Sequence, residues 1–404
     1  MWQFFSILRI WSWLLKFLMI TSVFPPAYKE GGPPRVNFHL AKALLNQGHA
    51  VQVLTTDCDA ADRLDVRTGV ETTFDGIPVV YYRHLWTRSF CFSPGLEMEI
   101  IQRKDEFDVG LVRGHWTYIN LCASAILRVL GKPFVLYPEG CLDPWVLQHR
   151  RWKKHFYWHL IEKRNYGWAS GIVALTNAEV AQIRQMGCDG NIAVIPNGIS
   201  LAELERPRDV KALLPTRIGR RRLILFMSRI HSKKALDLLI RAFAEIHKVH
   251  PDTVLVVAGP DEDADYGERV RFLASELVID NSVRFVGMVT GPERLALLHS
   301  ATVFVLPSHS EGLPLAVLEA AACRVPVVIS EACNLPEFGQ TGAGVVVHPD
   351  VPSIVQGLLR VLTSEDERRA MGERAYQLVC ERFTWERVAQ QTVAFCESLV
   401  QQRV

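Results

Sequence analysis

"RLILFMSRIHSKKALDLLIRAFAEIHKVHPDTVLVVAG", residues 222–259, is the stretch that decides the fold. It opens and closes on continuous apolar runs, RLILFMS and TVLVVAG, which are typical of parallel strands buried on both faces. The segment between them repeats apolar residues at three- and four-residue spacing, for example Leu236, Leu239 and Ile240, and this predicts a helix. The stretch therefore predicts one strand–helix–strand unit of a parallel sheet.

A second region, near the start of the chain, follows the same plan. The strand KFLMITSVF, a loop with Gly31 and Gly32, the helix PRVNFHLAKALLNQ and the strand AVQVLTT come in that order, and Gly48 ends the helix. The later runs VRFVGMV, VFVLP, PVVIS and GVVV supply further strands. Because 404 residues exceed one ordinary core, we expect an α/β protein of two doubly wound, Rossmann-like domains.

The domain limits follow from a change in composition. Proline, glycine and charged residues between Asn197 and Gly219 indicate a linker. We expect a first domain over residues 1–200 and a second over 201–384, with a final helix, about 385–404, packing back on the first. Ligands of such sheets bind beyond the carboxyl ends of the strands, so a site is expected in the cleft between the domains.

Composition excludes several classes of protein. Hydrophobic residues make up 49%, which indicates a folded protein. The 45 basic and 43 acidic residues leave a net charge of +2, which argues against a nucleic-acid partner. The 9 cysteines form no Cys-x-x-Cys pair, so neither a disulfide framework nor a zinc site is indicated. A reducing, cytoplasmic location fits best.

The segment SHSEGLPLAVLEA, residues 308–320, places Glu311 in a loop and Glu319 on the following helix. A helix N-terminus is a seat for phosphate, and the two carboxylates can accept hydrogen bonds from hydroxyl groups on either side of it. Ribose on one side and a sugar on the other would make the ligand a nucleotide sugar. The alternative is a capping carboxylate and an ordinary surface glutamate. The residues of the expected phosphate seat are Gly312, Leu313, Pro314 and Leu315.

Two basic residues, Arg229 and Lys234, follow the first strand of the second domain. A guanidinium and an ammonium there can neutralise a diphosphate, although a solvated basic turn would look the same. Asp57–Asp59 and Asp261–Asp265 look like Asp-x-Asp metal ligands. Since the basic residues and the helix N-terminus already supply positive charge, we expect no essential metal and no other cofactor.

These pieces together resemble the retaining GT-B glycosyltransferases of family 4 (group 1). EGLPLAVLE matches their Glu-x7-Glu motif, and SRIHSKKALDLLIRAF resembles their donor-diphosphate loop. EGGPPRVNFHLAKALLNQGHAV resembles their N-terminal glycine loop, and VIPNGI the segment before the linker. EGCLDPWVLQHRRWKKHFYWHLIEKRNYGWASGIVALTNAEVAQI resembles their acceptor-domain helices. The resemblance covers nearly everything after the first dozen or so residues.

The resemblance implies a role for each matching position in the donor half. Arg229 and Lys234 would bind the donor diphosphate, and Glu319 would hold the ribose hydroxyls. Glu311 would contact the transferred sugar and stabilise the positive charge that develops at its anomeric carbon. The departures Ala235 and Arg324 stand where the family has glycine. We expect little harm from alanine at a helix start, and roughly 1–2 kcal/mol of strain at Arg324 if its φ is positive.

The acceptor half contributes further candidates. The resemblance implies that Gly31 and Gly32 bring backbone amides close to the phosphate or acceptor, and that His115 faces the cleft near the donor sugar. By itself, a histidine such as His115 would more often be a core histidine. Ser200 and Glu139 depart from the family pattern, and Glu139, where relatives carry a basic or neutral residue, is expected to tune acceptor specificity.

The leading hypothesis is a hexosyltransferase that acts with retention. It would use a UDP- or GDP-linked sugar and a glycan or lipid-linked acceptor, in exopolysaccharide, lipopolysaccharide or glycolipid synthesis. One alternative is a GT-B nucleotide-sugar epimerase, which the Glu-x7-Glu spacing disfavours. Another is an inactive subunit that binds a nucleotide sugar.

Two stretches raise the possibility of membrane contact. MWQFFSILRIWSWLL, residues 1–15, is apolar, but Arg9 and Lys16 leave no uncharged span long enough for a membrane helix. LQHRRWKKHFYWHLIEKRNYGW, residues 147–168, mixes six basic and six aromatic residues with the single acid Glu162. Such a stretch can bind anionic lipid, which would put the protein at the inner face of the cytoplasmic membrane. The alternative, aromatic rings packed inward under a solvated charged face, stays open.

Overall fold

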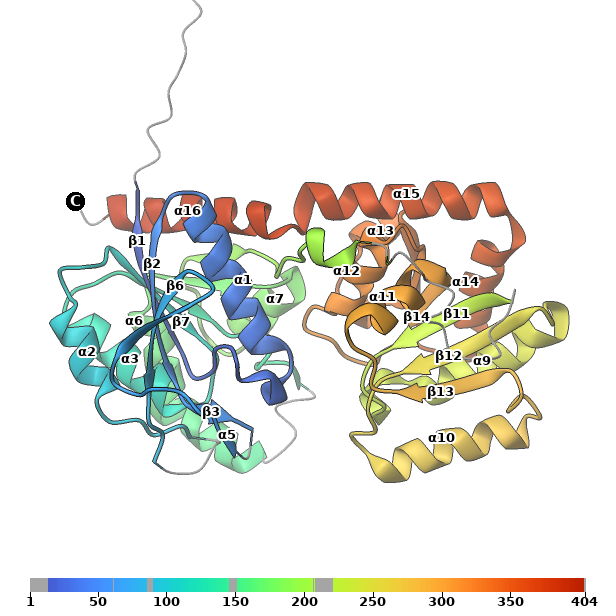
Figure 1. Cartoon of the computed structure of the whole chain (residues 1–404), viewed down its shortest axis with the longest axis horizontal. Coiled ribbons are helices and arrows are strands. Elements are labelled where there is room, and N and C mark those ends of the chain that lie inside the picture. The colour runs from blue at the N-terminus through green and yellow to red at the C-terminus, as the bar shows by residue number, and fades with distance from the viewer. Residues whose placement is uncertain are drawn as a thin grey trace, which may run out of the picture.

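The computed structural model describes residues 14–60, 62–85, 90–144, 151–205, 207 and 221–402. Residues 1–13 of the apolar N-terminal stretch and most of the predicted linker lie outside this range. The described chain forms two α/β domains side by side, each built on a mainly parallel sheet (Figure 1). The predicted fold of two doubly wound domains is confirmed.

The N-terminal domain is built on an eight-stranded sheet in which only the β5–β6 pair is antiparallel. In spatial order its strands are β10 (Ile192–Val194), β9 (Gly171–Ala174), β8 (Phe134–Tyr137), β7 (Val109–Arg113), β1 (Lys16–Thr21), β2 (Ala50–Thr56), β6 (Ile77–Tyr82) and β5 (Glu71–Phe74). Its helices and turns are η1 (Tyr28–Glu30), α1 (Gly32–Asn46), α2 (Leu96–Gln102), α3 (Tyr118–Val129), α5 (Arg151–Tyr157), the π-helical η2 (Trp158–Glu162), α6 (Lys163–Trp168), α7 (Asn177–Gln185) and η3 (Ala202–Leu204). Beside the sheet, β3 (Cys58–Asp59) pairs with β4 (Asp62–Arg63).

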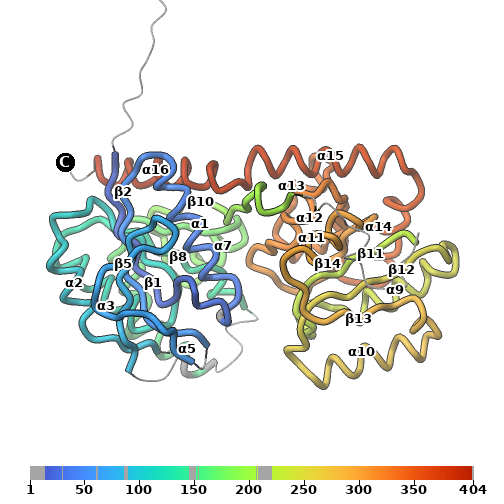
Figure 2. Tube along the Cα trace, in the orientation of Figure 1, coloured from blue at the N-terminus to red at the C-terminus, as the bar shows by residue number. Residues whose placement is uncertain are grey.

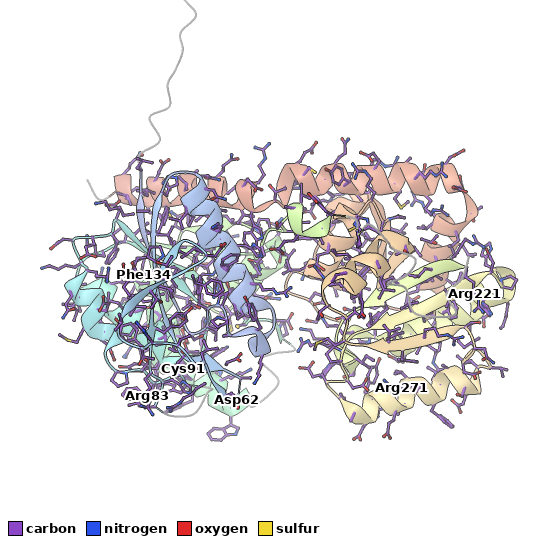
Figure 3. All side chains as sticks on the ribbon, in the orientation of Figure 1. Asp62, Arg83, Cys91, Phe134, Arg221 and Arg271 are labelled. Atoms are coloured by element: carbon purple, nitrogen blue, oxygen red, sulfur yellow. The ribbon has the colours of Figure 1, made fainter. Side chains whose placement is uncertain are left out.

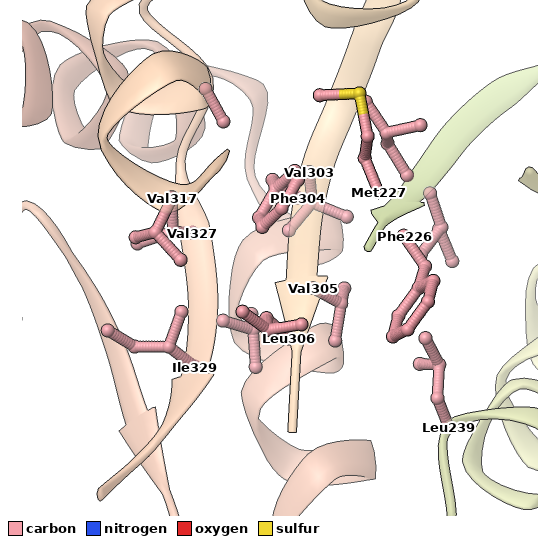
Figure 4. Packing of buried hydrophobic residues seen from close by; sticks show 14 of the residues in the cluster. Phe226, Met227, Leu239, Val303, Phe304, Val305, Leu306, Val317, Val327 and Ile329 are labelled. Carbon is pink, nitrogen blue, oxygen red and sulfur yellow. The ribbon is translucent and has the colours of Figure 1, made fainter. Parts of the chain in front are cut away.

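The C-terminal domain is built on a six-stranded, all-parallel sheet. In spatial order its strands are β13 (Val283–Gly287), β12 (Thr253–Ala258), β11 (Arg222–Met227), β14 (Ala301–Leu306), β15 (Val327–Ser330) and β16 (Gly344–Val347). Its helices and turns are η4 (Ser232–Lys234), α9 (Leu236–Val249), α10 (Ala264–Glu276), α11 (Gly291–Ser300), α12 (Leu315–Ala322), η5 (Glu331–Cys333), α13 (Glu337–Gln340), α14 (Val351–Thr363) and α15 (Glu365–Arg382). Figure 4 shows its core, where Phe226, Val305 and Ile329 of three neighbouring strands are buried.

The strand ends lie close to those that the apolar runs predict. β2 and β16 match AVQVLTT and GVVV to the residue. β1 stops at Thr21, three residues before the predicted end. The side-chain amide of Asn37 donates to Thr21 Oγ1 and to the Val23 carbonyl, each at 2.9 Å, so the backbone beyond Thr21 finds its partner outside the sheet.

The last two helices join the domains. In Figures 1 and 2, α15 runs along the C-terminal domain and α16 (Trp385–Gln401) continues over the N-terminal one. The buried side chains of Trp385, Val388 and Cys396 belong to the same core cluster as those of β1 and α1. Between the helices, the Ile199 amide donates to the Phe383 carbonyl at 2.8 Å, so the two segments that cross between the domains lie together.

Candidate functional site: a cleft between the two sheets

The centre of the site is a buried ion pair between Lys234 and Glu311. Lys234 ends the loop after β11, and Glu311 lies in the loop after β14, so the parallel order of these neighbouring strands brings the two loops together. Lys234 Nζ lies 2.6 Å from Glu311 Oε1, and both side chains are about nine-tenths buried (10% and 8% exposed). Ser308 Oγ donates to the same oxygen at 2.6 Å. The pair is therefore held rigidly before any ligand arrives.

The backbone after Glu311 leads into helix α12. Pro314 is the N-cap, with φ −78° and ψ 99°, so the helix starts one residue later than a first-turn proline would imply. Among the described residues, no hydrogen-bond acceptor faces the amides of Gly312, Leu313 and Leu315. Free amides at a helix N-terminus bind anions, so the geometry suits the expected phosphate seat.

Glu319 has a partner that the sequence did not reveal. Arg294, on α11, lies 2.5 Å from Glu319 Oε2, and both side chains are largely buried. Arg294 lines two adjoining cavities between the domains, of about 50 and 470 Å³, and Glu319 lines the smaller. The only sequence signal for Arg294 is a lone arginine after a Gly-Pro helix start, which is too common to single out.

Arg229 lies at the carboxyl end of β11, as the sequence predicts, but on the surface. Its side chain is 58% exposed and pairs with Glu262 at 2.5 Å. Lys233, next to Lys234, is half-buried, and burial lowers its pKa. Three cations thus lie within one short loop, two of them able to move toward an incoming diphosphate.

The two domains touch where the loops after β8 and β14 meet. A Cβ built on Gly140 would lie 3.4 Å from the Gly312 Cα, so the two glycines are in close contact. Ser310 Oγ donates to Asp143 Oδ2 of the other domain at 2.6 Å. A cavity of about 270 Å³ beside this contact is lined by Glu311, Ser310 and Asp143, among others. Ser310 and Asp143 both lie in stretches that resemble the family, but no sequence pattern pairs a residue of one domain with a residue of the other, so their contact could not be predicted.

The glycine loop of the N-terminal domain faces open space. Gly31 has φ 83° and ψ −124°, a combination that favours glycine, and a Cβ at Gly31 or Gly32 would meet nothing within 4 Å. Gly31 is the N-cap of α1, and Gly32 is its first residue. The loop therefore leaves the room that a ligand needs to approach the backbone.

His115 lies in an aromatic cluster of its own domain. Its ring contacts Trp116 and Tyr166 edge-on, with centroids 4.6 and 5.6 Å apart. Burial lowers the pKa of His115, and its Nε2 is buried with no hydrogen-bond partner among the described residues. His115 does not line the cavity beside Glu311. The structure thus does not bring the two together, and a catalytic role for His115 stays a prediction.

Glu139 forms an ion pair with a buried arginine. Arg113, at the end of β7, is 2% exposed; it contacts the Glu139 carboxylate and lies 4.4 Å above the Tyr137 ring. Arg113 Nε donates to Asn37 Oδ1 at 2.5 Å. Glu139 adopts φ 54°. The pair explains how an acid is accommodated beside Gly140.

The two departures from glycine both have left-handed backbones. Ala235 has φ 51° and ψ 40°, so the expectation that alanine simply suits a helix start was wrong: this N-cap needs a positive φ. Arg324 has φ 59°, as expected for a glycine position. Its guanidinium lies 3.7 Å from the Tyr376 ring centroid and 2.8 Å from Glu373, contacts that offset part of the strain.

The aspartate tripeptides bind other groups of the protein. Asp57 Oδ1 lies 2.6 Å from His84 Nδ1, and Asp59 accepts from the Lys29 amide at 2.9 Å. Asp261 pairs at 2.9 Å with Arg271 of α10, which Figure 3 labels, and Asp263 caps that helix. In the described part of the chain, no group of three or more His, Cys, Asp or Glu side chains is arranged to hold a metal ion.

Two known families match the chain, one over each domain. The family described as Glycosyltransferase Family 4 matches residues 30–203, and the family described as Glycosyl transferases group 1 matches residues 215–378. A glycogen synthase of Mycobacterium tuberculosis is 27% identical over 94% of this chain and 93% of its own. A D-inositol 3-phosphate glycosyltransferase of Kineococcus radiotolerans is 31% identical over 58% of each chain.

Solved structures share the whole architecture. Alr3699/HepE of Anabaena, in complex with UDP and glucose, superposes with a TM-score of 0.70 at 19% identity, over 95% of this chain and 100% of that one. The sucrose-phosphate synthase of Thermosynechococcus elongatus superposes with a TM-score of 0.71 at 20% identity, over 96% of this chain and 100% of that one.

Two facing Rossmann-like domains, joined by a C-terminal helix that returns to the first, define the class of GT-B proteins, as predicted. With one family match on each domain, the chain belongs to the group 1, or family 4, glycosyltransferases.

Proposed function

We propose that the protein moves a hexose from a UDP- or GDP-linked sugar to a glycan or lipid-linked acceptor, with retention of anomeric configuration. The observation that carries the proposal is the buried Lys234–Glu311 pair at the N-terminus of α12. An ammonium and free amides at one helix N-terminus support a diphosphate bound there, with the Glu311 carboxylate beside the sugar. Arg229 and Lys233 add positive charge for the leaving nucleotide.

The positions of the cavities support a nucleotide sugar as donor. The cavity beside Glu311 and the two adjoining cavities beside Arg294, one of them also lined by Glu319, lie at opposite ends of the 311–319 segment. A sugar in the first and a nucleoside in the second would place the diphosphate at the amides between them. Alr3699/HepE has been solved with UDP-glucose, and one relative is a GDP-mannose-dependent mannosyltransferase, so both bases are candidates.

The proposed chemistry needs no metal and no organic cofactor. As the leaving group departs, Glu311 stabilises the developing positive charge at the anomeric carbon, and the cations of the 229–234 loop stabilise the diphosphate. Asp57, Asp59, Asp261 and Asp263 are engaged elsewhere. Turnover is expected to be unchanged by a chelator, and loss of turnover that added Mg²⁺ or Mn²⁺ restores would reject this part.

We place the enzyme in the cytoplasm, on the inner face of the membrane, in exopolysaccharide, lipopolysaccharide or glycolipid synthesis. Free cysteines fit a reducing compartment. In the described part of the chain, no helix is both long and apolar enough to cross a bilayer.

The donor is tested by a thermal-shift screen against UDP-, GDP- and ADP-sugars, followed by turnover with the sugars that bind. The anomeric configuration of the product, read by NMR, tests retention. Stabilisation by one class of nucleotide sugar and a product with the donor's configuration are expected. An inverted product rejects the retaining mechanism, and interconversion of donor epimers without transfer makes the protein an epimerase.

A further inference from the structure

The helical segment 151–168 leaves three large apolar side chains uncovered. Trp152, Phe156 and Leu160 are 73%, 66% and 46% exposed, and they follow one another at four-residue spacing along α5 and η2. Side chains at this spacing lie on one face of a helix. We call these three residues the apolar stripe. Helix α5 lies at the lower edge of the N-terminal domain in Figures 1 and 2.

The opposite face of the segment is fixed to the domain. Trp158 is 2% exposed, and the Glu162 carboxylate, 1% exposed, accepts hydrogen bonds from the Trp116 amide at 3.2 Å and Asn165 Nδ2 at 3.1 Å. Tyr166 is also buried. The aromatic residues of this segment thus divide into an inward set and an outward set, and the outward set cannot turn in without breaking these contacts.

The exposed charges of the segment itself have one sign. Lys163 and Arg164 are exposed, as are the rings of His155 and His159. The single acid in residues 151–168 is Glu162, which is turned inward. An exposed face with tryptophan, phenylalanine and leucine beside basic residues is the pattern of helices that lie in the headgroup region of a membrane. Two copies of this face would repel each other, which disfavours self-association.

We propose that the apolar stripe, with Lys163 and Arg164, docks the N-terminal domain on an anionic lipid bilayer. This docking proposal rests on the proposed sugar transfer and makes it more specific, because the acceptor would be a lipid-linked molecule held in the bilayer. The inward face of the same segment contacts the 115–116 loop: the rings of Trp158 and Trp116 lie 6.4 Å apart, and those of Tyr157 and Trp116 5.8 Å apart. An acceptor held in the bilayer would therefore arrive at the N-terminal domain, the side of the molecule on which the acceptor is proposed to bind.

The test is co-sedimentation of the full chain with vesicles of phosphatidylcholine alone and of phosphatidylcholine mixed with phosphatidylglycerol. The first variant combines Trp152→Ser, Phe156→Ser and Leu160→Ser, and the second combines Lys163→Ser and Arg164→Ser. The matched control combines Val249→Ser, Phe272→Ser and Val278→Ser, which removes three apolar side chains that are 63%, 67% and 84% exposed on the other domain.

We expect the wild type and the control to pellet with the anionic vesicles, and less so as salt rises. Each stripe or charge variant should lose about tenfold or more of this partitioning. Equal, negligible pelleting of the wild type with both vesicles overturns the proposal, as does wild-type binding by the stripe variant. A dimer in sedimentation velocity that only the stripe variant abolishes would assign the face to a second copy and likewise overturn it.

The thermal shift with UDP or GDP, measured on the same proteins, separates this proposal from the proposed transfer. The stripe variant should keep the wild-type shift, which also shows that it is folded. Stripe-dependent vesicle binding without any nucleotide shift in the wild type would leave the docking face standing and remove the transferase. A nucleotide shift without vesicle binding would remove the docking face and leave the proposed transferase standing.

Discussion

The two domains use one loop design in two ways. In the N-terminal domain β1 leads through η1 to Gly31 and helix α1, and in the C-terminal domain β11 leads through η4 to Ala235 and helix α9. In both, a short 3₁₀ turn ends on a residue of positive φ that is the N-cap of the helix. The same backbone plan therefore presents a helix N-terminus to the cleft from each side.

The two loops differ in the surroundings of their lysine side chain. The lysine of the first turn, Lys29, is exposed and pairs with Asp62 at 2.6 Å. The lysine of the second, Lys234, is buried against Glu311 of the next loop. A glycine loop with open space suits the approach of a neutral or variable group, whereas a buried, paired cation suits a fixed anion. The difference is consistent with the proposed roles, in which the acceptor approaches the first loop and the donor diphosphate binds at the second.

The largest effect is expected where the second loop loses its buried cation. Lys234→Ala should lower turnover by about 10²-fold or more. It should also destabilise the fold by about 3–5 kcal/mol, because Glu311 is left buried without a counter-charge. Steady-state kinetics and urea unfolding measure the two effects. Lys248→Ala, which removes an exposed Lys–Glu pair of similar length, should change neither.

A double variant separates stability from chemistry. Lys234→Ala with Glu311→Gln removes both charges, so it should recover much of the lost stability but none of the activity. If turnover recovers together with stability, Lys234 is structural and the donor assignment fails.

Arg229 is expected to matter for activity but not for folding. Its side chain is 58% exposed, so Arg229→Ala should leave the unfolding midpoint near that of the wild type. Loss of a charged contact to the leaving diphosphate should lower turnover by about 10²-fold. Arg271→Ala, on the same domain and likewise paired with an acidic side chain, that of Asp261, is the control. Near-wild-type kinetics for Arg229→Ala would mean that Lys234 and the helix amides bind the diphosphate without Arg229.

The two glutamates should differ in which kinetic constant they change. Glu319→Ala should raise KM for the donor by about tenfold with little change in kcat, because ribose contacts are the same in the ground and transition states. Glu311→Ala should mainly lower kcat. Initial rates over a range of donor concentrations distinguish them, and the opposite pattern would mean that the two roles are exchanged.

Much of the fold and part of the site could be predicted from the sequence. Apolar runs located the six strands of the second sheet but only β1 and β2 of the first, and the motifs placed Lys234 and Glu311 in loops after strands of the second sheet. Their pairing was not predicted, because it depends on β11 and β14 being neighbours in the sheet. Arg294 could not be predicted, since it reaches Glu319 from another helix without a motif. Nor could the Ser310–Asp143 contact, which depends on how the domains pack.

The aromatic segment shows a further limit of sequence patterns. The π-helical turn at Trp158–Glu162 shifts the helical register, so no single helical wheel describes residues 151–168. This is why the sequence could not decide between inward and outward rings: Trp158 is buried and Trp152 is exposed.

The smallest effect is expected from exchanging glycine and alanine at the two N-caps, Gly31 and Ala235. This exchange is also the most direct test of the shared loop design. Ala235 is in the left-handed helical region, which residues other than glycine can enter at a modest cost, so Ala235→Gly should stabilise the protein by about 0.5–1 kcal/mol. Gly31, at φ 83° and ψ −124°, lies outside that region, and Gly31→Ala should destabilise by about 1–3 kcal/mol although no atom obstructs the new Cβ. Urea unfolding of both variants measures the difference. If both variants changed the free energy of unfolding in the same direction, the two N-caps would not be equivalent. The two loops would then share only the order of their elements along the chain.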